Sequence, residues 1–319
     1  MSVSTFDGTD AGRADSDSDS PILVTGATGR QGGATARRLL AAGRPVRVLV
    51  RDTEAPAALA LAAAGARLVR GDLDDLSGLA RALDGVAGVF GIPPVVLGPS
   101  GVDTEVEAAR GRALIDAAVA AGVEQVVFST VASTSAPLPG GAGKRAIEEY
   151  LLDRVAMPTV LRPVRFMTNY LGVAVAGIDG ISHGMHRHLF PPHEPMQIIA
   201  VEDIAEFALL AFTDPARFAG RTLELAGDQP TPVAAAAAIS EATGIAVRYE
   251  QLTDDEAAAL GTEIAAVRTN WRDGYRWHAD IEALRVIHPG LRTFGDWLAE
   301  SGATVLRDHL TAAGVESVR

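Results

Sequence analysis

A glycine-rich turn between an apolar run and a helical pattern constrains this chain more than any other stretch. Residues 21–24 (PILV) predict a buried strand, and residues 34–40 (ATARRLL) predict a helix. Between them lie Gly26, Gly29 and Gly32. Glycines at such positions let the backbone turn tightly and let a phosphate approach the helix N-terminus. The spacing is GxxGxxG, not the GxGxxG of the dehydrogenase fingerprint, so the flanking strand and helix carry much of the prediction.

Predicted strands alternate with helical stretches from Pro21 onward. The six strands are expected at residues 21–25, 45–50, 66–70, 86–90, 125–130 and 158–162. Such an alternation is typical of a parallel sheet that is covered by helices on both faces. We therefore predict an α/β fold, with a doubly wound, Rossmann-like parallel sheet and a smaller C-terminal substrate region.

Composition excludes several classes of function. The chain of 319 residues is long enough to bury a full core. Its net charge of −12 argues against nucleic acid and membrane surfaces as partners, because both require a concentrated basic face. It has no cysteine, so disulfides and thiolate ligands are excluded. Apolar runs stay below the roughly 20 residues of a membrane span, and we expect a cytoplasmic protein.

The residues that directly follow the strands are the first candidates for ligand binding, because ligands of such sheets bind beyond the carboxyl ends of the strands. Arg51 and Asp52 follow the second strand. An arginine there would bind a ribose 2′-phosphate, whereas a carboxylate would bind a 2′-hydroxyl. Arg51 is nearer the strand end, and Arg30 in the turn offers a second charge. The pattern favours NADP as cofactor and leaves NAD open.

Two further turns complete the predicted cofactor cleft. After the third strand, an acid in the stretch GDLDD at 71–75 is expected to cap the next helix, and Asp72 is also placed to meet an adenine amino group. After the fourth strand, the turn Gly91-Ile92-Pro93-Pro94 is predicted to flank the nicotinamide ribose.

Lys144 is the only lysine among the 28 basic residues. The fifth strand ends at Ser129-Thr130, and Lys144 follows in the predicted first turn of the next helix. A cation is electrostatically unfavourable at a helix N-terminus, which strengthens a functional interpretation over a solvated surface lysine. Lys144 and Thr130 are our candidate catalytic residues.

A histidine-rich segment interrupts the alternation after residue 169. It contains His183, His186, His188 and His193, among several prolines. The spacing matches no helical metal pair, so we predict no metal. We expect a loop that folds over the substrate pocket, with one histidine able to donate a proton near neutral pH.

Seven motifs together resemble one family. They are VTGATGRQGG at 24–33, VLVRD at 48–52, GDLDD at 71–75, AAGVEQVVFST at 120–130, Lys144 with IEEYL at 147–151, LRPVRFMTN at 161–169 and VEDIAEFALLAF at 201–212. The chain resembles the NmrA-like branch of the atypical short-chain dehydrogenase/reductases, which is related to isoflavone reductases. The resemblance covers residues 21–300.

The resemblance implies a role for individual residues. The pyrophosphate would lie on Gly26, Thr28, Gly29, Gln31 and Gly32. Arg51 would bind the 2′-phosphate, and Asp72 with Leu73 would contact the adenine. Lys144 would contact the nicotinamide ribose, and Pro163, Phe166 and Asn169 would line the nicotinamide end.

The resemblance and the β/α pattern divide the chain into four parts. We expect a disordered leader at 1–20 and an NAD(P)-binding Rossmann domain at 21–164. A mixed substrate-binding region at 165–300 should return partly to the main domain, and 301–319 should form a C-terminal helix and tail.

One departure from the family pattern leaves the function open. Most short-chain reductases use a Tyr-x-x-x-Lys pair, but the residue four positions before Lys144 is Gly140. We favour an NAD(P)H-dependent reductase that transfers hydride to a small carbonyl, quinone, imine or activated alkene. The missing tyrosine also suits a non-catalytic NADP(H) sensor that regulates a protein partner. Redox-neutral chemistry with a retained nucleotide is a third hypothesis.

Overall fold

The structure is a computed structural model that describes residues 20–94, 96–98, 101–134, 140–172 and 178–312. The predicted leader, apart from Ser20, and the last seven residues of the predicted tail lie outside the described residues.

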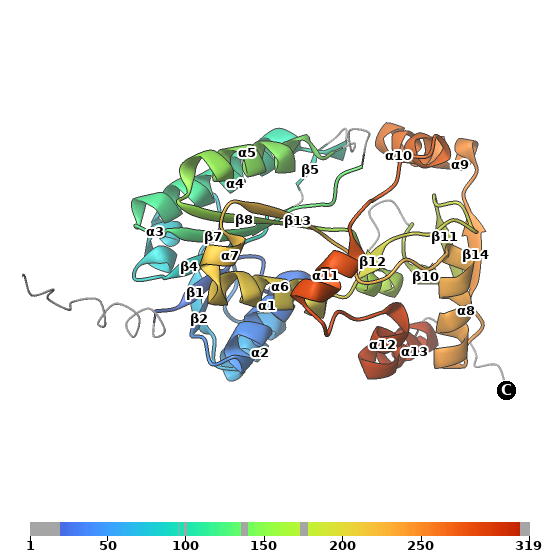
Figure 1. The fold of residues 1–319 in the computed structure, drawn as a ribbon, viewed down its shortest axis with the longest axis horizontal. Coiled ribbons are helices and arrows are strands. Elements are labelled where there is room, and N and C mark those ends of the chain that lie inside the picture. Colours follow the sequence, from blue (N-terminus) through green and yellow to red (C-terminus); the bar gives the residue numbers. More distant parts are fainter. Residues whose placement is uncertain (1–19, 95, 99–100, 135–139, 173–177, 313–319) are drawn as a thin grey trace, which may run out of the picture.

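A seven-stranded sheet forms the centre of the larger half of the molecule (Figure 1). All its neighbouring strands are parallel. The strands, in spatial order, are β3 (Arg67–Arg70), β2 (Val46–Val50), β1 (Ile22–Val24), β4 (Gly88–Gly91), β7 (Gln125–Ser129), β8 (Met157–Pro163) and β13 (Arg221–Leu225). The predicted α/β fold with a doubly wound parallel sheet is confirmed, and β13 is a strand that the sequence pattern did not indicate.

Helices cover both faces of this sheet (Figure 1). One face carries α1 (Arg30–Ala41), α2 (Pro56–Ala63), α6 (Val201–Thr213) and α7 (Pro215–Phe218). The opposite face carries α3 (Leu76–Leu83), α4 (Thr104–Ala120) and α5 (Ala142–Arg154). Strand β1 serves both layers, because successive side chains of a strand point to opposite faces. Ile22 and Val24 pack with α1 and α6, whereas Leu23 packs with α3 and α4.

The smaller half is built from short strands and the C-terminal helices. Its strands are β10 (Ile181–Ser182), β11 (Met185–His188) and β14 (Arg248–Gln251) in one sheet, and β9 (Arg165–Phe166) paired with β12 (Ile198–Ile199). Its helices are η1 (Met167–Leu171), α8 (Pro232–Thr243), α9 (Asp254–Ala259), α10 (Thr262–Arg272), α12 (Phe294–Trp297), η3 (Leu298–Gly302) and α13 (Ala303–Ala312). A hairpin of β5 (Leu97–Gly98) and β6 (Gly101–Val102) belongs to the larger half.

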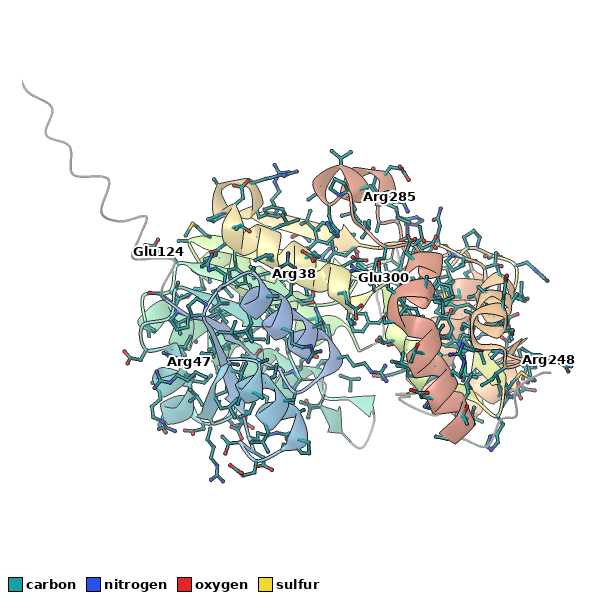
Figure 2. The ribbon with its side chains drawn as sticks, turned by 90° about the horizontal axis from the view of Figure 1, so that it is seen from below. Arg38, Arg47, Glu124, Arg248, Arg285 and Glu300 are labelled. Atoms are coloured by element: carbon teal, nitrogen blue, oxygen red, sulfur yellow. The ribbon has the colours of Figure 1, made fainter. Side chains whose placement is uncertain are left out.

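Four elements that follow residue 200 belong to the larger half: α6, α7, β13 and α11 (Ile281–Ile287). Strand β13 pairs with β8 at the sheet edge. Helix α6 packs along α1, which carries Arg38 (Figure 2). Arg38 Nε lies 2.6 Å from Glu206 Oε1 of α6. Asp203 lies in the first turn of α6. Its carboxylate is fully buried and binds the backbone N–H and the guanidinium of Arg292, so it is an anchor.

Among the residues that the structure describes, no helix is both long enough and apolar enough to cross a membrane.

Candidate active site

The glycine turn after β1 leaves room for a ligand at the N-terminus of α1. Gly26 has a φ of 61°, which favours glycine. A Cβ atom at position 32 would lie 2.4 Å from the carbonyl oxygen of Gly26, so only glycine fits there. The N-cap residue, Gly29, has no side chain to accept from the first-turn N–H groups, and that turn contains no acidic residue. Free N–H groups and the helix dipole suit a bound anion such as a pyrophosphate.

A cavity of about 330 Å³ opens beside this turn, at the carboxyl ends of β1, β2, β3 and β4. Seven of the lining residues belong to the turns that the sequence predicts to bind a cofactor: Gly26, Thr28, Arg51, Gly71, Asp72, Leu73 and Ile92. The hydroxyl of Thr25 accepts a hydrogen bond from the N–H of Ile92 at 2.9 Å and joins the two central strand ends. Pro93 is buried next to Ile92 and does not line the cavity.

The acidic residues around this cavity are already hydrogen bonded. Asp72 Oδ1 accepts from the N–H groups of Asp74 and Asp75 at 2.9 and 3.0 Å, so Asp72 stabilises the turn before α3. Asp74 forms two hydrogen bonds with Arg110 of α4. Asp52 Oδ1 accepts from the N–H of Glu54, and Asp52 does not line the cavity. Arg51 is therefore the residue after β2 that faces this space.

Helix α1 also contacts the other side of the site. The side-chain amide of Gln31 donates to Ser129 at the end of β7. The guanidinium of Arg30 donates to the carbonyl of Thr168 in η1. Burial lowers the pKa of Arg30, partly offset by the nearby Asp179. Arg30 thus lies toward the substrate-binding region and does not join Arg51 as a second charge beside the ribose.

A second cavity, of about 340 Å³, lies beyond the carboxyl ends of β7 and β8. It is lined by Thr130, Val131, Thr134, Pro163, Val164, Arg165, Phe166, Asn169, Asp179, His188, Phe190, Val267, Trp271 and Trp277. Its aromatic wall is tightly packed: the ring centroids of Phe190 and Trp271 are 4.3 Å apart, and those of Trp271 and Trp277 are 5.2 Å apart. Apolar walls with a few polar groups are typical of small-molecule sites.

The polar groups of the second cavity converge on Asp179. Its carboxylate accepts from the guanidinium of Arg165 and from Asn169 Nδ2 at 2.6 Å, and it lies 3.3 Å from His188 Nε2. Burial opposes its ionisation, but Arg165 and His188 outweigh burial and hold the pKa of Asp179 below its ordinary value. Its φ of 90° is unusual for a residue other than glycine, and such backbone strain concentrates at functional sites.

Only one of the four clustered histidines lines the cavity. His188 stacks on Phe190 with ring centroids 4.1 Å apart. Its Nδ1 accepts from the N–H of Leu189, and its Nε2 faces Asp179, so both ring nitrogens are engaged. Burial lowers the pKa of His188 despite Asp179. The expected histidine proton donor is therefore not found in this arrangement, since a neutral, doubly engaged imidazole has no proton to release toward the cavity.

Thr130 is held by a chain of charged residues behind the second cavity. Its hydroxyl donates to the buried carboxylate of Glu148. Arg162 Nη2 lies 2.5 Å from Glu148 Oε2, and Arg162 Nη1 lies 3.2 Å from Glu224 Oε1. Because the hydroxyl hydrogen of Thr130 is donated in a hydrogen bond to Glu148, Thr130 offers the cavity an acceptor oxygen and no donor.

Lys144 lies in the first turn of α5 but faces α4. Its Nζ is 2.5 Å from Oε1 of Glu107, whose carboxylate is fully buried, and Lys144 lines neither cavity. Gly143 allows this approach, since a Cβ there would lie 2.5 Å from the carbonyl oxygen of Thr104. The contact of Lys144 with a nicotinamide ribose stays a prediction.

No tyrosine of the described chain lines the second cavity. The tyrosine that is missing from the Tyr-x-x-x-Lys pair is therefore not replaced by another one there. Gly140 has a φ of 70°, a conformation that disfavours any side chain. The hydroxyl of Tyr150 donates to Asp116 on the exposed side of α4 and α5. Tyr170 is buried, with the guanidinium of Arg165 4.1 Å from its ring centroid.

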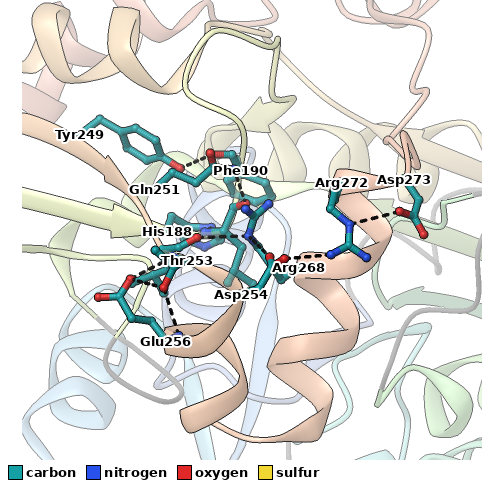
Figure 3. A network of polar contacts seen from close by, with 12 residues as sticks. His188, Phe190, Tyr249, Gln251, Thr253, Asp254, Glu256, Arg268, Arg272 and Asp273 are labelled. Carbon is teal, nitrogen blue, oxygen red and sulfur yellow. Dashed lines mark hydrogen bonds and ion pairs between the residues drawn. The ribbon is translucent and has the colours of Figure 1, made fainter.

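Helix α10 forms part of the cavity wall through Val267 and Trp271. Figure 3 shows how α10 is fixed: Arg268 Nε donates to the carbonyl of Leu252 at 3.1 Å, and Arg272 Nη1 lies 2.9 Å from Asp254 Oδ2. In the same network, the hydroxyl of Tyr249 donates to the carbonyl of Phe190. Strand β14 thereby fixes Phe190, and the contacts of α10 fix Trp271, in the wall of the second cavity.

Within the described ranges, no group of three or more His, Asp or Glu side chains is arranged to hold a metal ion.

Comparison with known proteins places this chain among NAD(P)-linked proteins. The model of the NmrA-like family matches residues 18–268. A (4-alkanoyl-5-oxo-2,5-dihydrofuran-3-yl)methyl phosphate reductase of Streptomyces griseus subsp. griseus is 34% identical over 240 residues, covering 74% of this chain and 78% of that protein. An NAD(P)H azoreductase of Xenophilus azovorans is 33% identical over 239 residues, with the same coverage of 74% and 78%.

Two solved structures share the fold. NmrA, a negative transcriptional regulator solved in complex with NADP, aligns with a TM-score of 0.73 at 20% identity, covering 94% of this chain and 99% of that chain. The triphenylmethane reductase of Citrobacter sp., complexed with NADP(H), aligns with a TM-score of 0.70 at 19% identity, covering 88% and 99%.

The buried imidazole of His186 predicts acid sensitivity. Burial, together with the nearby charges of Arg165 and His188, holds the pKa of His186 well below the ordinary 6.5. Below pH 6.5 the imidazole of His186 binds a proton in the unfolded chain but not in the folded protein. The free energy of unfolding should therefore fall as the pH is lowered from 6.5, by about 1.4 kcal/mol per pH unit for this one group.

His186→Phe should remove that part of the slope, measured by urea unfolding between about pH 6.5 and about pH 5. The exposed His193 provides the control, since His193→Phe should keep the wild-type slope. An equal slope in wild type and His186→Phe would contradict the assignment.

Proposed function

The chain belongs to the NmrA-like family, and we propose that it is an NAD(P)H-dependent oxidoreductase that reduces a flat, apolar acceptor in the second cavity. The observation that carries this proposal is the aromatic cavity beyond β7 and β8, whose lining begins at Thr130, next to the Ser129 that Gln31 contacts from the first turn of α1. Reductases among its relatives support the same activity. In this proposal residues 21–164 bind the cofactor, and most of residues 165–300 form the substrate side.

The residues around the glycine turn fit the dinucleotide. Gly26, Gly29 and Gly32, with the free first turn of α1, would hold the pyrophosphate. Arg51, Asp72 and Leu73 would surround the adenosine, and Pro163, Phe166 and Asn169 would line the nicotinamide end. When bound, the reduced nicotinamide supplies a hydride. The NADP-complexed neighbours in the same fold support this cofactor.

The chain's own residues position the acceptor and exclude water, but they offer no proton near neutral pH. The carboxylate of Asp179 is ionised, the guanidinium of Arg165 stays charged, and both nitrogens of His188 are engaged. The hydroxyl of Thr130 donates its hydrogen bond to Glu148 and not toward the cavity. A quinone or activated alkene suits such a site best, because its delocalised anion takes a proton from water without an acid from the protein.

The competing candidate is a sensor that binds NADP(H) and regulates a protein partner. One observation favours it: Lys144, the remaining member of the usual catalytic pair, faces Glu107 and not the cavity. Against it, the second cavity has an ordered wall of four aromatic side chains, which dinucleotide binding alone does not require.

The test mixes purified protein with NADPH and a panel of quinones, enones, imines and ketones, and follows the absorbance of the reduced nicotinamide. We expect turnover with quinones or enones, and a rate of hydride transfer that varies by less than about twofold from about pH 7 to about pH 9, since the pKa values of Asp179 and His188 are lowered and that of Arg165 is raised. NADPH binding without turnover of any acceptor would exclude the reductase and leave the sensor.

Lys144→Met tests the remaining catalytic candidate. The single variant leaves Glu107 as a buried carboxylate without its partner, which should lower the free energy of unfolding by about 3 kcal/mol. The double variant Lys144→Met/Glu107→Gln should recover most of that loss. If Lys144 contacts the nicotinamide ribose, the double variant stays slow or binds NADPH weakly in spite of its recovered stability. Wild-type kinetics in the double variant would remove Lys144 from the mechanism.

A further inference from the structure

Arg30 is placed where a positive charge is unfavourable. It is the first residue of α1, and the helix dipole opposes a cation at a helix N-terminus. Burial also removes part of its hydration, which lowers the pKa of its guanidinium. Within the described residues this guanidinium donates only to the uncharged carbonyl of Thr168 in η1, and it forms no ion pair. A charge in such a place, turned toward η1 and without a counter-ion, calls for a functional explanation.

The guanidinium of Arg30 lies beside the polar floor of the second cavity, which is formed by Arg165, Asn169 and Asp179. Its partner Thr168 directly precedes Asn169, and the charge of Asp179 acts on Arg30. Asp179 is already paired with Arg165 and accepts a hydrogen bond from Asn169. Two guanidinium groups therefore face one carboxylate, and one positive charge is left uncompensated.

The acidic residues behind Thr130 leave this charge in place. Glu148 is paired with Arg162, whose Nη2 lies 2.5 Å from Glu148 Oε2. Glu224 also contacts Arg162, but it belongs to the edge strand β13 and is partly exposed, so water screens its charge. The floor of the second cavity is therefore positive, and it favours a negative charge on a bound molecule.

We infer that the charge of Arg30 stabilises the anion that forms on the acceptor during hydride transfer. The inference rests on the proposed function, because it assumes that the second cavity holds an acceptor beside a reduced nicotinamide. The acceptor gains one hydrogen and two electrons as the C4–H bond of the nicotinamide breaks, so the acceptor becomes an anion and the cofactor is left oxidised. A proton from water then completes the product. Asp179 alone would oppose this anion, but Arg165 offsets Asp179, and Arg30 makes the field favourable.

Two substitutions separate the charge of Arg30 from its hydrogen bond. Arg30→Gln removes the charge but keeps an N–H donor for the carbonyl of Thr168, whereas Arg30→Lys keeps the charge. Each protein would be saturated with NADPH and mixed without oxygen with 1,4-naphthoquinone, or with the acceptor that wild type reduces fastest, in a single-turnover experiment. We expect Arg30→Gln to slow hydride transfer about tenfold, less than the loss of a donor in direct contact with an oxyanion, and Arg30→Lys to stay within about threefold of wild type. The dissociation constant of NADPH should change by less than about twofold in both variants.

The matched control is Arg37→Gln, which removes a charge from an exposed position of the same helix and should leave the rate unchanged. A wild-type rate in Arg30→Gln would overturn the inference, and so would an equal loss in Arg30→Gln and Arg30→Lys. Weaker NADPH binding by Arg30→Gln with an unchanged rate at saturation would assign Arg30 to the cofactor instead. In each of these cases turnover by wild type leaves the proposed function standing. If wild type binds NADPH but reduces no acceptor, the proposed function fails, and this inference fails with it.

Discussion

The close contact between Gly32 and the carbonyl of Gly26 is the constraint on which the site depends. No side chain fits at position 32, because its first carbon would lie 2.4 Å from that oxygen. Helix α1 can therefore begin directly above the end of β1, with its first-turn N–H groups uncovered. Strand β1 lies between β2 and β4, at the point where the order of the sheet reverses, and this is where ligands of such sheets bind.

The same helix relates the two cavities to each other. Gln31 contacts Ser129 at the end of β7, and Arg30 contacts Thr168 in η1. On the substrate side, Asp179 then gathers Arg165, Asn169 and His188. A buried carboxylate with this many partners fixes the shape of the cavity floor, and its charge is compensated. The result is a rigid, largely apolar space with an ionised base and no acid, which is why we assign it an acceptor that needs no proton from the protein.

The sequence predicts well where the pattern is local. The glycine turn, the six strands and the residues at their ends follow from periodicity and turn chemistry within short windows. Strand β13 was missed because Arg221, Thr222 and Glu224 make it polar, as an edge strand tolerates.

Lys144 is in the first turn of its helix, as predicted, but its ammonium group meets Glu107, 37 residues earlier in the chain. Such a contact between distant segments leaves no local signal. Asp179, Trp271 and Trp277 were not predicted either, since Asp179 and Trp277 come from irregular segments and Trp271 from helix α10, and no local pattern relates the three. The positive φ of Asp179 has no counterpart in the sequence pattern.

Deuterium transfer tests the central claim most directly. NADPH labelled with deuterium at C4 of the nicotinamide would be oxidised by an enone in the presence of the protein, and the product would be analysed by mass spectrometry and NMR. We expect one deuterium at the β-carbon of the product, in a single stereochemical position set by the walls of the second cavity. The hydrogen at the α-carbon should come from solvent, because no residue of the cavity supplies it. Absence of deuterium from the product, or its equal distribution over both faces, would contradict hydride transfer in this cavity.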